Sequence, residues 1–93
     1  MTRIALSLAF LCAMAASASA ACYADYKAKK DDPLQLQYGV AEVYGECTTT
    51  AAAAELRARL AADGWQLLEV VSTFDESGLE GRRGNAGEYY LRY

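Results

Sequence analysis

The pattern of apolar and polar positions divides the chain into one almost continuous apolar stretch and several shorter periodic segments. Residues 4–16 form the apolar stretch, with Arg3 before it and small residues at 18–20 after it. This is the arrangement of a secretory signal peptide. Thirteen residues are too few to cross a bilayer, which takes about 17 to 25. We therefore expect cleavage near Ala20, which removes residues 1–20 and leaves no membrane span.

Cleavage there would leave Cys22 close to the new N-terminus, where a lipoprotein anchor would be attached. Lipoprotein signals usually carry Leu three residues before the cysteine, whereas Ser19 occupies that position here. We therefore favour export without lipidation, to the periplasm or the extracellular space.

Three cysteines are present, and Cys12 would leave with the signal peptide. Cys22 and Cys47 then remain as an even pair in a chain bound for an oxidising compartment, which predicts a disulfide. The alternative is a redox-active dithiol, but the pair lacks the Cys-x-x-Cys spacing of such sites.

The first part of the mature chain, residues 21–34, is polar and ends in the turn signal Asp31-Asp32-Pro33, which predicts a short helix or an irregular arm. Residues 35–44 alternate and predict a strand. Its apolar face is expected to carry Leu36, Tyr38, Val40 and Tyr44, and its other face Gln35, Gln37, Ala41 and Val43.

The segment 48–64 is rich in Ala, Leu, Arg and Glu and predicts a helix. Any of the threonines at 48–50 can cap its start, and Gly64 suits a left-handed stop in which Trp65 contacts Leu60. Its buried stripe is expected to hold Ala52, Ala53, Leu56 and Leu60.

Two further strands are predicted after the helix. Residues 65–74 are apolar on both sides, so something must cover both faces of that strand, and residues 87–93 alternate. The glycine-rich segment between them, 75–86, is expected to be irregular.

These elements predict an α+β domain over residues 35–93, in the order strand, helix, strand, strand. We expect a small, mostly antiparallel three-stranded sheet with one helix packed on one face. The disulfide would tie the N-terminal arm, 21–34, to this domain. The arm is the leading candidate to cover the second face of the sheet, ahead of a second copy in a homodimer.

Charge and histidine content exclude several functions. The mature chain carries eight Lys and Arg against twelve Asp and Glu, a net charge of −4, which argues against nucleic acid as a partner. The chain has no histidine, which removes His-based nucleophilic triads and HExxH zinc sites. We expect no metal, no cofactor and no enzymatic activity.

Two groups of residues are candidates for binding. Arg82 and Arg83 lie in the glycine-rich segment and could donate to a carboxylate or a sugar acid, although a mobile loop is the alternative. Seven tyrosines are a high density for this chain length, and tyrosine is enriched at interfaces. Strand packing accounts for most of them, and the interface hypothesis centres on Tyr90, Tyr23 and Tyr26.

The segment LRARLAADGWQLLEVVS followed by GEYYLRY resembles two families. One is a class of small bacterial proteins of unknown function with a helix, Gly-Trp, a strand and a closing strand. The other is the first part of the SPOR domain, the sporulation-related repeat, in which a strand, an Ala-rich helix and two strands form part of a peptidoglycan-binding sheet. The resemblance covers residues 36–93 and lacks the second helix and last strand of a SPOR domain.

We therefore expect a non-catalytic module that binds a protein or another envelope component. The alternative is a glycan-binding module of the SPOR type, and a third hypothesis, from another class, is a small enzyme.

Overall fold

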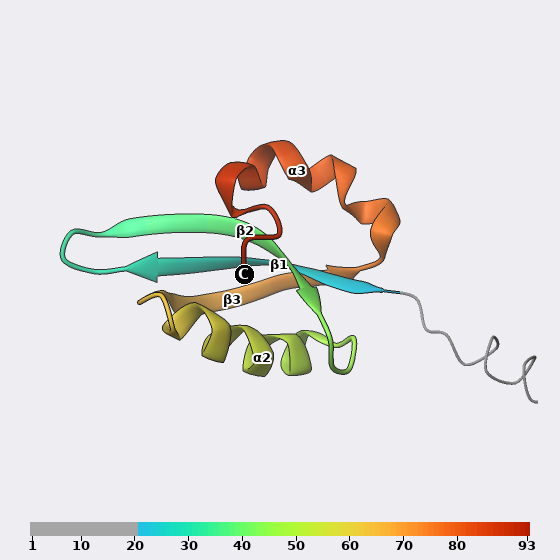
Figure 1. The fold of residues 1–93 in the computed structure, drawn as a ribbon, viewed down its shortest axis with the longest axis horizontal. Coiled ribbons are helices and arrows are strands. Elements are labelled where there is room, and N and C mark those ends of the chain that lie inside the picture. Colours follow the sequence, from blue (N-terminus) through green and yellow to red (C-terminus); the bar gives the residue numbers. More distant parts are fainter. Residues whose placement is uncertain (1–20) are drawn as a thin grey trace, which may run out of the picture.

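The computed structural model describes residues 21–93, which form a sheet enclosed between two helical layers (Figure 1). The predicted signal peptide lies outside the described residues. In chain order the elements are strand β1 (Cys22–Lys30), strand β2 (Gln35–Val43), helix α2 (Thr49–Ala61), strand β3 (Gln66–Phe74), a 3-10 turn (Glu76–Gly78), helix α3 (Glu80–Ala86) and a second 3-10 turn (Gly87–Tyr89).

The sheet has the order β2-β1-β3, and both strand pairs are antiparallel. The prediction of an α+β fold with a small antiparallel three-stranded sheet is confirmed. The order of elements is strand, strand, helix, strand, and not the expected strand, helix, strand, strand. The reason is that residues 22–30 supply a strand, whereas residues 87–93 contribute only one isolated bridge, between Tyr90 and Val40.

Strand β1 lies where we expected a separate arm, and it is the central strand. It pairs with β2 along one edge and with β3 along the other. Ala24 and Ala28 are fully buried and belong to the same core cluster as Ala52 of α2. The expected boundary between 21–34 and 35–93 is therefore wrong, because the supposed arm is hydrogen-bonded into the middle of the domain.

Helix α2 begins and ends as the sequence predicts. The Thr48 hydroxyl accepts a hydrogen bond from the Ala51 amide at 3.1 Å. At the other end, Gly64 has φ +79° and the Trp65 amide donates to the Leu60 carbonyl at 3.0 Å, which is the six-to-one bond of a Schellman stop. The helix buries Ala52, Leu56 and Leu60, and Ala53 is half-buried.

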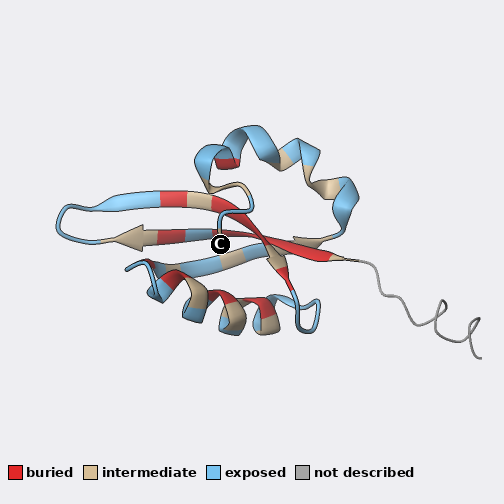
Figure 2. Ribbon diagram, in the orientation of Figure 1, coloured by how far each residue is buried: buried red, intermediate tan, exposed pale blue. Residues whose placement is uncertain are grey.

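The main core lies between α2 and the sheet (Figure 2). From β2 it takes Ala41 and Val43, which we had placed on the outer face, whereas Leu36 and Tyr44 are exposed. The expected apolar face is thus wrong for Leu36 and Tyr44 but correct for Val40, which is fully buried, and the strand itself is confirmed. The core consists of Cys22, Ala24, Tyr26, Ala28, Ala41, Val43, Ala52, Leu56, Leu60 and Trp65.

Strand β3 is an edge strand and is not covered on both faces. Its pairing with β1 shifts register twice, and its residues Leu68 and Val71 remain 50% and 47% exposed. Bulges of this kind twist an edge strand and reduce its tendency to pair with other chains.

The second face of the sheet is covered by the C-terminal segment, and not by an arm. Residues 76–78 and 80–86 are helical where we expected irregular structure, and α3 lies over this face (Figure 1). Beyond α3 the chain passes the edge of β2, where the Leu91 amide donates to the Val40 carbonyl at 2.8 Å. Tyr89 and Tyr93 then pack against the core below.

The disulfide between Cys22 and Cys47 is present, with Cα atoms 5.9 Å apart. It joins the start of β1 to the loop before α2.

Among residues 21–93, no helix is long and apolar enough to cross a membrane.

Candidate functional site

The carboxylate of Asp25 is buried on β1 beneath the C-terminal segment, with 5% of the residue exposed. Ser72 donates a hydrogen bond to one carboxylate oxygen at 2.7 Å. Tyr38 and Arg82 donate to the other, at 2.8 and 3.0 Å. We call these four residues the Asp25 cluster. It joins all three strands to α3.

Arg82 makes further contacts that fix its guanidinium. One terminal nitrogen donates to the Gly78 carbonyl at 2.8 Å, and the guanidinium carbon lies 3.9 Å from the centre of the Phe74 ring. We expected Arg82 to donate to a carboxylate of a ligand, and the carboxylate that it meets is Asp25 of the same chain.

The protonation states in the cluster favour a structural role. Burial raises the pKa of Asp25, but hydrogen bonds from Ser72, Tyr38 and Arg82 outweigh it and hold that pKa below its usual value. Burial and the hydrogen bond to Asp25 raise the pKa of Tyr38 to about 12. At neutral pH the carboxylate is therefore charged and the phenol is protonated, so neither group is suited to proton transfer there.

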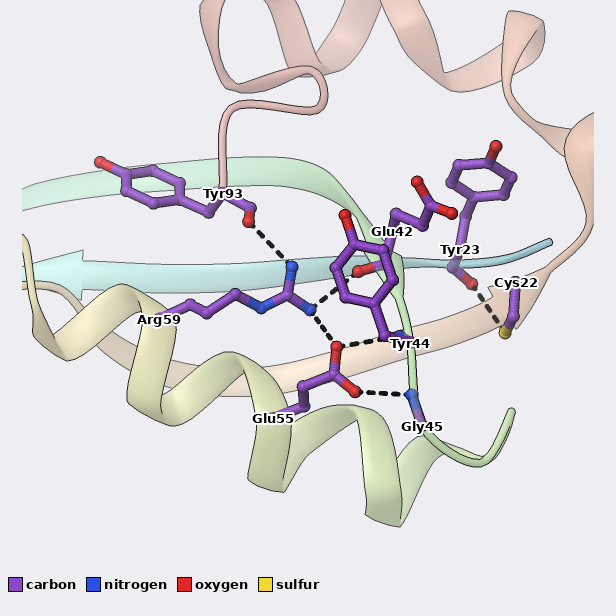
Figure 3. A network of polar contacts seen from close by, with 8 residues as sticks. All are labelled: Cys22, Tyr23, Glu42, Tyr44, Gly45, Glu55, Arg59 and Tyr93. Carbon is purple, nitrogen blue, oxygen red and sulfur yellow. Dashed lines mark hydrogen bonds and ion pairs between the residues drawn. The ribbon is translucent and has the colours of Figure 1, made fainter.

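A second polar network connects α2 to the rest of the fold (Figure 3). Arg59 pairs with Glu55 one helical turn earlier and donates to two backbone carbonyls, those of Glu42 and Tyr93, both at 2.8 Å. Arg59 thus ties the helix both to the end of β2 and to the C-terminal segment.

Glu55 completes this network by binding the loop after β2. Its carboxylate accepts hydrogen bonds from the amides of Tyr44 at 3.0 Å and Gly45 at 2.9 Å (Figure 3). The hydrogen bond from the Tyr44 amide lowers the pKa of Glu55 most. The hydrogen bond from the Gly45 amide and the charge of Arg59 lower it further, so the pKa stays below its usual value although burial raises it. Both side chains of the Glu55–Arg59 pair are only 24% exposed.

An open apolar area lies at the end of the sheet that α3 leaves uncovered. The β1–β2 hairpin extends beyond both helices (Figure 1), and Leu34 and Leu36 on it are 64% and 69% exposed. A shallow hollow of about 350 Å³ is formed there by Leu36, Tyr38 and Leu68 together with Lys27, Ala28 and Gln37. We call Leu34, Leu36, Tyr38, Leu68 and Lys27 the hairpin surface.

The hollow adjoins the Asp25 cluster, since Tyr38 belongs to both. Lys27, which lines the hollow, pairs with Glu69 of β3 at 3.8 Å, and both side chains are more than half exposed.

The structure places the predicted binding residues in different surroundings. Tyr26 is fully buried in the core and Tyr23 is buried beside Phe74, so neither belongs to a free surface. Arg83 is exposed, with its guanidinium 5.5 Å from the ring of Tyr90, which is half-buried. Of the five candidates, only Arg83 and Tyr90 therefore remain available to a partner.

The hairpin surface was missed because Leu36 and Tyr38 fit the pattern of a strand packed on a core. Leu36 and Tyr38 alternate on the same face as Val40, which is fully buried, so the pattern of the strand carries no signal that separates them from core residues.

Within residues 21–93, no group of three or more Cys, Asp or Glu residues is arranged to hold a metal ion. The chain matches no family model, no curated protein and no solved structure.

Proposed function

We propose that the chain is exported and that its mature part is a non-catalytic protein-interaction module of the periplasm or the extracellular space. The observation that carries this proposal is the hairpin surface, on which Leu34, Leu36 and Leu68 are each at least half exposed. Clustered exposed apolar side chains around a hollow are typical of surfaces that another molecule covers.

The polar chemistry of the domain supports binding rather than catalysis. The Asp25 and Arg59 networks combine the carboxylate, hydroxyl and guanidinium groups that an active site could use, but these groups bind one another and the backbone. Leu34, Leu36 and Leu68 remain exposed and are free to contact another molecule.

Export is supported by the signal-peptide pattern of residues 1–20 and by the disulfide, which forms and persists in oxidising compartments. Mass spectrometry of the protein recovered from a secreting bacterium tests this point. We expect a chain that begins near Ala21, unlipidated and two mass units lighter than its reduced form. A full-length or thiol-reactive chain would contradict it.

The interaction is tested by placing a photo-crosslinking amino acid at position 34 of the full chain in living cells. We expect a crosslinked protein product that is lost with Leu68→Asp and kept with Val71→Asp. Leu68 and Val71 are exposed to a similar degree on the same strand, but only Leu68 lines the hollow. Equal yields in the two variants, or no product, would contradict the proposal.

A glycan-binding module of the SPOR type is the second candidate, and one observation favours it. Arginines lie near tyrosine rings along the C-terminal segment: Arg83 is 5.5 Å from Tyr90, and Arg92 is 5.8 Å from Tyr89. Aromatic rings and guanidinium groups together suit sugars that carry carboxylates. Sedimentation with purified peptidoglycan at low salt tests it, and failure to sediment would remove it.

A further inference from the structure

We propose that the surroundings of Asp25 form a guanidinium-binding pocket that Arg82 of α3 fills from within the chain, and that this pocket accepts the guanidinium of another molecule when α3 lifts from the sheet. The pocket is a different site from the hollow of the hairpin surface and goes beyond the proposed function. Two features support it, the groups that surround the Arg82 side chain and the weak attachment of α3.

The pocket supplies what a guanidinium group requires, which is an anion, further acceptors and a flat apolar surface. The Asp25 carboxylate accepts from Nε of Arg82 at 3.0 Å, and the Gly78 carbonyl accepts from one terminal nitrogen at 2.8 Å. The other terminal nitrogen donates to the Ser72 hydroxyl at 3.4 Å. The guanidinium carbon lies 3.9 Å from the centre of the Phe74 ring, within the range of a cation–π contact. The side chain that occupies the pocket thus defines the class of ligand.

The anion of the pocket belongs to the sheet and does not depend on α3 for its position. Ser72 and Tyr38 donate to the Asp25 carboxylate at 2.7 and 2.8 Å, so two side chains of the sheet still orient it when Arg82 leaves. A buried carboxylate that has lost its cation is strongly destabilising. The pocket therefore favours a new cation in place of Arg82.

Helix α3 lies over the sheet (Figure 1) and is weakly attached to it. It has no side-chain hydrogen bond at its N-terminus and buries only Ala86. A Cβ atom at Gly81 or Gly84 would meet nothing within 4 Å, so this part of the helix is not closely packed. The chain is anchored on both sides, by β3 and by the hydrogen bond from the Leu91 amide to β2. Residues 75–90 can thus open while the sheet stays folded, as weakly packed segments commonly do.

Native-state hydrogen exchange of the oxidised mature protein measures this opening. The amides of Arg82 and Arg83 both donate to the Leu79 carbonyl and report on α3. After correction for intrinsic rates, we expect them to exchange at least about 100-fold faster than the central amides of β1, and at a rate that low urea does not change. Exchange of α3 and β1 through one common opening would overturn the proposal.

The class of ligand is tested by adding about 100 mM ethylguanidinium, which matches the Arg82 side chain beyond Cβ, during hydrogen exchange of the wild type. A ligand that binds only the open form raises the open population by mass action. We therefore expect exchange of the α3 amides to rise about threefold or more, while exchange in β1 stays unchanged.

Ethylurea has the same shape without the charge and is the matched control, with sodium chloride added to equal ionic strength. It should leave exchange of the α3 amides unchanged, and Asp25→Asn should not respond to ethylguanidinium. Equal effects of the two compounds on the wild type, or an equal response of Asp25→Asn to ethylguanidinium, would overturn the proposal.

The variant Arg82→Ala tests the pocket without competition from Arg82. Its thermal midpoint should rise with ethylguanidinium and reach a plateau, with half of the effect at about 1 to 30 mM. Arg83→Ala keeps Arg82 in the pocket, so its midpoint should not rise. A rise in both variants, or in neither, would overturn the proposal. Should Arg82→Ala not fold, exchange of the wild-type protein decides the question alone.

Discussion

Arg82 of α3 donates a hydrogen bond at 3.0 Å to Asp25 of β1, although the two residues are 57 positions apart in the sequence. Helix α3 has seven residues, two of them glycine, and buries only Ala86. Such a helix has little stability of its own, so its position on the sheet depends on tertiary contacts. The pair between Arg82 and Asp25 is one of these contacts.

Arg82→Ala should therefore destabilise the protein. The change leaves the buried Asp25 carboxylate without its cation, and breaking a buried pair in this way usually costs about 3 to 5 kcal/mol. We expect about 2 kcal/mol, because the Arg82 side chain is 32% exposed and both Ser72 and Tyr38 still donate to Asp25. Urea unfolding followed by circular dichroism measures it.

Arg83→Ala is the matched control, since Arg83 is the next residue and is exposed. Its effect on the free energy of unfolding should stay within about 0.5 kcal/mol. Equal urea midpoints for the Arg82 and Arg83 variants would show that the ion pair does not hold α3 on the sheet.

Low pH should reduce the stability of the folded protein, in part because the Asp25 carboxylate becomes protonated. The pKa of Asp25 is lower in the folded protein than its ordinary value of 3.8. The charged carboxylate thus stabilises the fold fully above the unfolded pKa, and this contribution is lost as the pH falls through the folded pKa.

In Asp25→Asn this contribution is absent at every pH. We expect the variant to be less stable than the wild type at pH 7 and the difference to shrink below about pH 4. Urea unfolding of both proteins between pH 7 and pH 2 tests this, and a difference that stayed constant across that range would show that Asp25 has the same pKa in both states.

Local signals in the sequence predicted the elements whose stability is local. Thr48 and Gly64 mark the ends of α2 through hydrogen bonds within a few residues, and the Asp31-Asp32-Pro33 turn was recognised between two segments that prove to be strands. Those predictions required no information about tertiary packing.

The rest of the fold depends on contacts between residues that are far apart in the sequence, and a short stretch of sequence does not reveal such contacts. Strand β1 carries Asp25 and three lysines and looked like a polar arm, but Asp25 is neutralised by Arg82 from the far end of the chain. In the same way, α3 forms from a glycine-rich segment because the sheet holds it. The hairpin surface was missed for a related reason: the β1–β2 hairpin extends beyond both helices, so its apolar residues Leu34 and Leu36 stay exposed.

Loss of the disulfide should reduce stability substantially. The bond between Cys22 and Cys47 closes a loop with a sequence separation of 25 residues, for which loop-closure entropy predicts about 3.5 kcal/mol. The double variant Cys22→Ser, Cys47→Ser should therefore melt more than about 10 °C below the oxidised wild type. Adding a reductant should lower the midpoint of the wild type to that of the variant without affecting the variant. A wild type that melts at the same temperature with and without reductant would contradict this.

The same substitution at two glycines should change stability in opposite directions. At Gly39 a Cβ atom would overlap the hydroxyl and ring of Tyr26, which is fully buried and anchored by a hydrogen bond from its hydroxyl to Gln37 at 2.8 Å. The ring cannot move aside without disrupting the core, so Gly39→Ala should cost about 2 kcal/mol or more.

At Gly81, in α3, a Cβ would meet nothing within 4 Å. There alanine gains helix propensity and restricts the unfolded chain, so Gly81→Ala should stabilise the protein by about 0.5 to 1 kcal/mol. Urea unfolding of the two variants measures both effects. Destabilisation by Gly81→Ala would show that residues 80–86 are not helical in solution, and a neutral Gly39→Ala would show that Tyr26 does not pack against β2.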